Sequence, residues 1–209
     1  MRKYLLLILV LSVFSAGQAY AGISFVKKIT LVTEDKEDLL LQQKFYSEGD
    51  MLRIEEEAKG IEGNPGTRLY DLKNKKLYTI MLDVKLYMEQ DIELEKDNVM
   101  FEIPPEKKYA RHKDIKVLRT KQGEEEIQGH PAVRYEVKVA RTKEKGKEEQ
   151  VLDKYILWTA TDLGEMPIKY EFDLQNNSKK VIEYTDIKTD AIDPSLFVLP
   201  EGYMPINPF

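Results

Sequence analysis

Side chains that could perform catalysis or bind a metal are few and scattered in this 209-residue chain. The chain has no cysteine, and its two histidines, His112 and His130, stand apart in the sequence. We therefore expect neither a thiol nucleophile nor a metal site built on cysteine or several histidines. The sequence also lacks a Gly-x-Ser-x-Gly nucleophile motif and a glycine-rich phosphate loop. We predict a protein that is not an enzyme, with no catalytic residues, no metal site and no cofactor.

Two acidic runs, 55–57 and 124–126, carry the hard oxygen atoms that calcium prefers. Consecutive residues of a strand point to opposite faces, so the carboxylates of one run do not converge on one ion. We interpret both runs as solvated edges or turns. Two carboxylates that meet only in the folded protein could still form a glycosidase-type pair, and a hydrolase stays open as a third hypothesis.

Aromatic and methionine side chains are the other chemically distinctive group, with 12 Tyr, seven Phe, seven Met and a single Trp. At alternating strand positions they could line a concave apolar surface, or they could form an ordinary β core. The sequence alone does not separate these two roles. Our candidates for residues that line a ligand site are Phe45, Met81, Tyr87, Tyr135, Trp158, Tyr170 and Phe172.

The segments that must position these side chains are predicted to be strands, because apolar and polar residues alternate in them with period two. The clearest alternation is formed by Val133, Tyr135, Val137 and Val139. Lys27 interrupts the alternation of the first segment, 23–31. Polar turns separate the segments, one of them expected at Gly123, and no βαβ alternation occurs. The expected strands are 23–31, 39–45, 51–57, 67–71, 77–82, 84–88, 115–120, 133–139, 154–159, 168–174 and 180–187. We predict a mainly β domain with an antiparallel sheet, barrel or sandwich.

Two segments depart from this rhythm. The stretch 90–113 is rich in charge and contains Pro104 and Pro105, so we expect a loop across the sheet or a short helix near 91–99. Near the C-terminus, Asp193 can cap a short turn that Pro194 begins. Phe197 and Leu199 would then point into the core, and we interpret this segment as a structural latch.

The first 21 residues have the parts of a secretory signal peptide. Arg2 and Lys3 precede an apolar run at 5–14, and Ala19 and Ala21 have the small-x-small spacing of a cleavage site. The apolar run is too short to cross a bilayer. We therefore predict cleavage after Ala21, a periplasmic location, and one domain over 22–209. The acidic balance, a formal net charge of −5, argues against a nucleic-acid partner.

Several local motifs follow one another in a familiar order. They lie at 47–55 (SEGDMLRIE), 69–71 with 76–78 and 86–88, 127–137 (IQGHPAVRYEV), 157–158 with 166–169, and 193–203 (DPSLFVLPEGY). Their order resembles that of exported LolA-like proteins, the outer-membrane lipoprotein-sorting superfamily and its small relatives. The resemblance implies a strongly curved antiparallel sheet, a half-open barrel with a short helical or loop plug over its concave side. Relatives hold acyl chains in that concavity, and others act as envelope sensors.

These observations lead to two main hypotheses about function. The first is a non-enzymatic periplasmic carrier that binds an apolar moiety, such as a lipid or a lipoprotein acyl chain, inside the curved sheet. The alternative is an envelope sensor or interaction protein with a filled core, which docks another protein. An open apolar concavity would favour the first hypothesis, and a concavity filled by the protein's own side chains would favour the second.

Overall fold

The computed structural model describes residues 22–57, 66–94, 96–101, 112, 114–141, 150–174 and 177–206, which build one twelve-stranded sheet. The strand order is β12-β6-β5-β4-β3-β2-β1-β11-β10-β9-β8-β7. All neighbours are antiparallel except β12 and β6, which run parallel. The strands are β1 (Gly22–Val32), β2 (Glu37–Glu48), β3 (Met51–Glu57), β4 (Thr67–Asp71), β5 (Lys76–Met81), β6 (Leu86–Asp91), β7 (Ile115–Ile127), β8 (His130–Arg141), β9 (Gln150–Ala160), β10 (Met166–Asp173), β11 (Lys179–Lys188) and β12 (Met204–Ile206).

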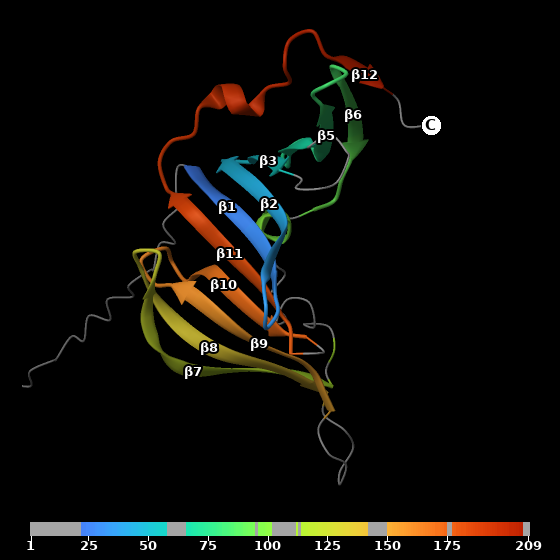
Figure 1. The fold of residues 1–209 in the computed structure, drawn as a ribbon. Helices are drawn as coiled ribbons and strands as arrows, with labels where there is room; N and C mark the ends of the chain where they lie inside the picture. The colour runs from blue at the N-terminus through green and yellow to red at the C-terminus, as the bar shows by residue number, and fades with distance from the viewer. Residues whose placement is uncertain are drawn as a thin grey trace, which may run out of the picture.

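The sheet is curved and open. Figure 1 shows β5, β6 and β12 turning away from the central strands at one end, while β7 and β8 curve around at the other. The edge strands β12 and β7 lie at opposite ends of the strand order, so the described sheet does not close into a barrel. The predicted fold class, a mainly β, curved and half-open antiparallel sheet, is confirmed.

Most of the expected strands are present, and β1 joins the two halves of the chain by pairing with β2 on one side and β11 on the other. The turn expected at Gly123 is wrong. The strand β7 continues through this residue with a register shift between Lys121 and Gly123, and the turn comes at Gln128 and Gly129, which both have positive φ angles. A glycine inside a strand pattern is as typical of a bulge as of a turn.

The segment 90–113 contains one short helix among the described residues, α1 (Lys96–Met100). It is shorter than the expected 91–99, because β6 continues to Asp91. The ring of Phe101 stacks on the ring of Phe25 in β1, and Met100 is 3% exposed. We call the face of the sheet that carries Phe25 the inner face, and the opposite face the outer face. In Figure 1, α1 is the green coil seen behind β1 and β2.

The C-terminal segment runs from β11 to the end of the strand order away from β7. There it adds the edge strand β12 beside β6, which the sequence did not indicate. It contains a 3₁₀ helix, η1 (Pro194–Phe197), in which the Asp193 carboxylate accepts a hydrogen bond of 2.9 Å from the Ser195 N–H. The Arg53 side chain donates a hydrogen bond of 3.1 Å to the Leu196 carbonyl. The expectation that Phe197 is a core anchor is wrong, because no residue of η1 is buried. Ile192, just before the turn, is the buried residue of this segment at 9% exposure.

Two sequence predictions lie wholly or partly outside the described residues. They are the signal peptide at 1–21 and the part of the stretch 90–113 that contains Pro104 and Pro105. No helix in the described part of the chain is long and apolar enough to cross a membrane.

Candidate ligand-binding face

The centre of the inner face is a cluster of aromatic rings around Phe25. In the sheet register Phe25 lies opposite Phe45, and their rings stack with centroids 4.8 Å apart. Tyr184 of β11 meets Phe25 edge to face at 5.4 Å, and Phe101 contacts both rings at 5.6 Å. Phe25, Phe45 and Tyr184 are each no more than 2% exposed. Rings at these spacings attract one another beyond the gain from burial alone.

The ring cluster continues along the inner face toward β9. Tyr170 lies 6.4 Å from Tyr184, and Phe172 lies 6.0 Å from Tyr170. Tyr155 of β9 completes the series at 5.0 Å from Phe172. Phe45, Phe25, Phe101, Tyr184, Tyr170, Phe172 and Tyr155 therefore form an unbroken series of ring contacts. We call these seven rings the aromatic row.

Cross-strand pairs share a face, which places each residue expected to line the site. Phe45, Tyr170 and Phe172 belong to the aromatic row, and Tyr135 lies opposite Leu157, itself opposite Tyr170. The opposite pairs Phe45–Ile54, Ile54–Arg68 and Arg68–Thr79 continue the inner face across to β5. Met81 lies two residues after Thr79 in β5 and is therefore also on the inner face.

Tyr87 and Trp158 lie on the outer face and are not positioned to line the inner one. Tyr87 is opposite Ile80 and its ring contacts Tyr78 at 6.1 Å. Trp158 follows the inner residue Leu157 in β9, so its side chain points to the other side. The sequence around Trp158 is apolar at consecutive positions, and alternation therefore could not tell the two faces apart.

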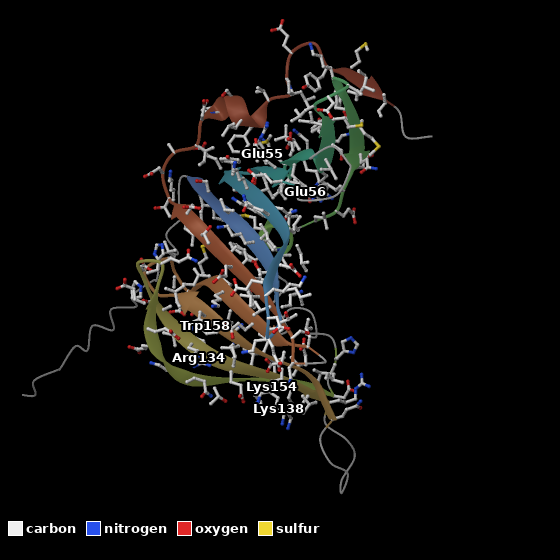
Figure 2. All side chains as sticks on the ribbon, in the orientation of Figure 1. Glu55, Glu56, Arg134, Lys138, Lys154 and Trp158 are labelled. Atoms are coloured by element: carbon white, nitrogen blue, oxygen red, sulfur yellow. The ribbon has the colours of Figure 1, made fainter. Side chains whose placement is uncertain are left out.

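Trp158 is held on the outer face by charged neighbours. Its Nε1–H donates a hydrogen bond of 2.7 Å to Glu125 Oε1. The Arg134 guanidinium and the Lys169 ammonium lie 5.4 and 5.3 Å from the ring centroid, within the range of a cation–π interaction. Figure 2 shows Trp158 and Arg134 close together on the lower half of the sheet. These neighbours leave Trp158 only 5% exposed.

A strip of polar side chains also crosses the inner face, beside the aromatic row. Lys27 lies opposite Gln43 in β2, and Gln43 lies opposite Glu56 in β3. Gln43 Nε2 donates a hydrogen bond of 2.6 Å to Glu56 Oε1, and the Arg68 guanidinium of β4 forms an ion pair with the same oxygen. Gln43 is 8% exposed, while the side chains of Glu56 and Arg68 are about one third exposed. We call Lys27, Gln43, Glu56 and Arg68 the polar strip.

The polar strip was missed by sequence reasoning, although one signal for it was present. Lys27 interrupts an otherwise apolar alternation, which marks a charged side chain on the buried face of a strand. Glu56 was interpreted as part of a solvated run with Glu55 and Glu57. In the structure Glu55 faces outward and pairs with Arg53 at 2.8 Å, whereas Glu56 faces inward. Figure 2 labels both carboxylates near the upper end of the sheet.

Two surface hollows lie among the described residues, and the second borders the strands that carry Phe25 and Phe45. One, of about 480 Å³, is at the β7–β8 turn and is lined by Glu124, Glu125, Glu126, Pro131, Ala132, Val133 and Thr161. The other, of about 260 Å³, lies near Asp186 and is lined by Ser24, Phe25, Val26, Lys44, Phe45, Tyr46, Asp186 and Lys188. In the same part of the chain, no group of three His, Asp or Glu residues is placed to hold a metal ion.

Comparison with known proteins adds the fold relationship. No protein-family model matches the chain, and no curated protein matches it. Among solved structures, an uncharacterized conserved protein from Thermus thermophilus aligns with a TM-score of 0.50 at 10% identity, over 91% of this chain and 92% of that one. The alignment thus spans nearly the whole of both chains. In this chain, the open curved sheet with the short helix α1 on its inner face is the architecture that the sequence motifs implied. This curved, half-open sheet is the fold that the resemblance to LolA-like proteins predicted.

Two further solved structures are similar at lower scores. A LolA superfamily protein from Nitrosomonas europaea aligns with a TM-score of 0.35 at 15% identity, over 86% of this chain and 91% of that one. The Mycobacterium tuberculosis lipoprotein LppX aligns with a TM-score of 0.44 at 9% identity, over 84% of this chain and 90% of that one.

Proposed function

We propose that this LolA-like protein is a non-enzymatic periplasmic carrier that binds an apolar moiety, a lipid or a lipoprotein acyl chain, on the inner face of its sheet. The observation that carries the proposal is the aromatic row, seven rings in contact along one face of an open sheet. The sequence motifs support it, because LolA-like relatives hold acyl chains in the corresponding concavity.

The energetic basis is the burial of apolar surface. Each methylene group of an alkyl chain that leaves water contributes about 0.8 kcal/mol before the costs of binding. Phe101 stacks on Phe25, and Met100 belongs to the same core cluster. A ligand would therefore replace the contacts of these two side chains or extend beyond them along Tyr170, Phe172 and Tyr155. Predicted export, with cleavage after Ala21, would bring the domain 22–209 to the envelope, where such ligands occur.

The proposal is tested by titrating delipidated protein with 1-dodecanol in a calorimeter. Binding at about one site per chain is expected. Tyr135→Ala, on the inner face, should weaken it, whereas Glu136→Ala, the next residue on the outer face, should leave it unchanged. Failure to bind, or equal effects of the two substitutions, would contradict the proposal.

N-terminal sequencing of exported protein checks the predicted cleavage after Ala21. A first residue other than Gly22 would contradict this cleavage site.

The alternative function, an envelope protein that docks another protein, is favoured by a specific observation. Phe45, Tyr170 and Tyr184 are at most 3% exposed, so the centre of the inner face is filled by the protein's own side chains. If the core stays closed, 1-dodecanol does not bind and a pull-down from envelope extract recovers a protein partner instead of a lipid. Native mass spectrometry of protein purified without delipidation separates the two functions directly.

A further inference from the structure

The strand β7 forms one edge of the sheet. It is 13 residues long and pairs with β8 on one side, and no other strand of the described residues pairs with its second side. Figure 1 shows β7 along the lower margin of the sheet. Part of the backbone N–H and C=O groups of such a strand points away from its neighbour, which makes the edge a template for a further strand.

A bulge divides β7 into two halves that are out of phase. The register shifts between Lys121 and Gly123, which leaves one extra residue in β7. Before the bulge Lys121 faces inward, because it lies opposite Tyr135. After the bulge Glu124 faces inward, because it lies opposite Val133. The inner face therefore carries odd-numbered residues in the first half of β7 and even-numbered residues in the second half.

This bulge restricts which strand can pair along the whole edge. A regular strand keeps a single phase, so its side chains would match the faces of only one half of β7. A second copy of β7, related by a two-fold axis perpendicular to the sheet, carries the same bulge. The first half of each copy then meets the second half of the other, and inner residues lie opposite inner residues on both sides of the bulge.

The backbone groups are in phase as well. Tyr135 and Val133 lie two residues apart in β8, so their partners Lys121 and Glu124 make the same kind of pair in the antiparallel ladder. Their N–H and C=O groups thus point the same way, either both toward β8 or both toward the edge. When Lys121 of one copy lies opposite Glu124 of the other, the two residues form a regular pair of an extended ladder.

The charges of β7 fit this register. The first half of the strand carries its basic residues and the second half its acidic ones: Lys116, Arg119 and Lys121, then Glu124, Glu125 and Glu126. Lys121 and Glu124 form an ion pair within one copy, and the two-fold axis brings two such pairs together with alternating signs. The exposed side chains of Arg119 and Glu126 meet next along the edge. No charge has to lack a partner in the single chain, because the second copy adds neighbours of opposite sign.

The outer face of the same edge contributes an apolar contact. Leu118 and Ile127 both face outward, because they lie opposite Lys138 and His130, each four residues from the outer residue Arg134. In the two-fold register Leu118 of one copy lies opposite Ile127 of the other. Leu118 is 49% exposed in the single chain, so this pair removes apolar surface from water, and the axis repeats it at both ends of the paired segment.

We propose that β7 is a dimerisation edge, at which two copies of this chain pair antiparallel with Lys121 opposite Glu124 and Leu118 opposite Ile127. The two sheets become one continuous sheet, and the inner faces of both copies lie on the same side of it. The contact is small compared with a standard protein interface, so the dimer forms reversibly as the concentration rises. The dimer does not depend on the proposed carrier function.

The register can be tested by disulfide cross-linking, since the chain has no cysteine of its own. Lys121→Cys and Glu124→Cys are made in separate chains, mixed and oxidised. Opposite residues of a ladder have Cα atoms about 4.5–5.5 Å apart, which suits a disulfide. We expect a linked dimer with one copy of each variant, identified by mass spectrometry. In the control mixture Thr120→Cys replaces Lys121→Cys; because Thr120 faces outward, this mixture should give much less of the linked dimer.

Sedimentation velocity over a concentration series measures the dimer without a cross-link. Leu118→Lys places a charge against Ile127, and Glu126→Lys places a second positive charge opposite Arg119. Each should weaken the dimer by about tenfold, because the two-fold axis applies the change twice. Leu174→Lys is the matched control, since Leu174 is 45% exposed outside β7, and it should leave the dimer unchanged.

A charge exchange separates the interface from a general effect on folding. Lys121→Glu alone places like charges opposite one another and should weaken the dimer, whereas the double variant Lys121→Glu with Glu124→Lys restores opposite signs and should recover it. Thermal melting confirms that each variant is folded.

Equal yields in the two cross-linking mixtures would overturn the proposal, and so would a wild-type protein that stays monomeric at every concentration. A dimer that Leu118→Lys, Glu126→Lys and Lys121→Glu all leave unchanged would lie at another surface and would also overturn it. Binding of 1-dodecanol tests the carrier function separately, so either proposal can fail while the other stands.

Discussion

Phe101, the residue that follows α1, stacks on Phe25 of β1 with ring centroids 5.6 Å apart. This contact fastens the short helix to the centre of the aromatic row, together with the hydrogen bond of 3.0 Å that Lys96 Nζ donates to the Gly49 carbonyl. A five-residue helix has little stability of its own, so its position depends on these tertiary contacts.

Replacement of Phe101 by alanine should uncover its two ring neighbours in the aromatic row, Phe25 and Tyr184. Because Phe101 is half-buried, the free energy of unfolding should fall by about 2 kcal/mol, less than for a fully buried phenylalanine. Urea denaturation measures this loss, and binding of a hydrophobic dye should increase. Leu94→Ala is the control, since Leu94 is 50% exposed just before α1. A dye signal that rises equally in both variants would contradict the covering role of Phe101.

Trp158 should not report binding on the inner face, although it is the only tryptophan. Its indole lies on the outer face near Arg134 and Lys169, and its Nε1–H donates a hydrogen bond to Glu125. We expect its emission maximum to stay unchanged when 1-dodecanol binds. A Tyr135→Trp substitution in a Trp158→Phe background places an indole on the inner face and should respond. A shift in the wild-type protein that the inner reporter does not share would contradict this assignment of faces.

The cap of η1 should make a small, pH-dependent contribution to stability. The Ser195 N–H hydrogen bond holds the pKa of the Asp193 carboxyl below its ordinary value of 3.8. Because the pKa is lower in the folded than in the unfolded protein, the ionised carboxylate stabilises the fold at pH values above 3.8. This stabilisation is lost as the pH falls through the pKa of the folded state. Asp193→Ala should therefore lower Tm by no more than about 4 °C at neutral pH.

The pH series gives the decisive comparison for this cap. The difference in Tm between wild type and Asp193→Ala should shrink as the pH drops below 3.8. Asp190→Ala serves as the control, because Asp190 is an exposed aspartate three residues earlier in the chain. A difference that persists unchanged in acid would show that the carboxylate charge does not contribute.

The strands were predictable because period-two alternation survives wherever one face is buried, as in β8 from Val133 to Val139. The faces were less predictable. In β9 apolar residues occupy both sides around Leu157 and Trp158, so only the cross-strand register assigns them. The edge strand β12 could not be predicted from the sequence, because its three residues, which include Pro205, are all exposed and show no alternation. The polar strip arises from four separate strands, and no local sequence window contains it.

Gly22, the first residue of β1, should tolerate no larger side chain. A Cβ atom there would lie 2.7 Å from the Asp190 carbonyl oxygen and 2.8 Å from Ile192 Cγ1, closer than real contacts allow. Gly22→Ala should therefore destabilise the protein by about 1–3 kcal/mol, the cost of an overpacked site. Gly123→Ala, inside β7, has nothing within 4 Å of the added atom and should change stability by less than about 0.5 kcal/mol. Urea denaturation of both variants measures the difference, and equal stabilities would show that the segment 190–192 does not pack against the start of β1.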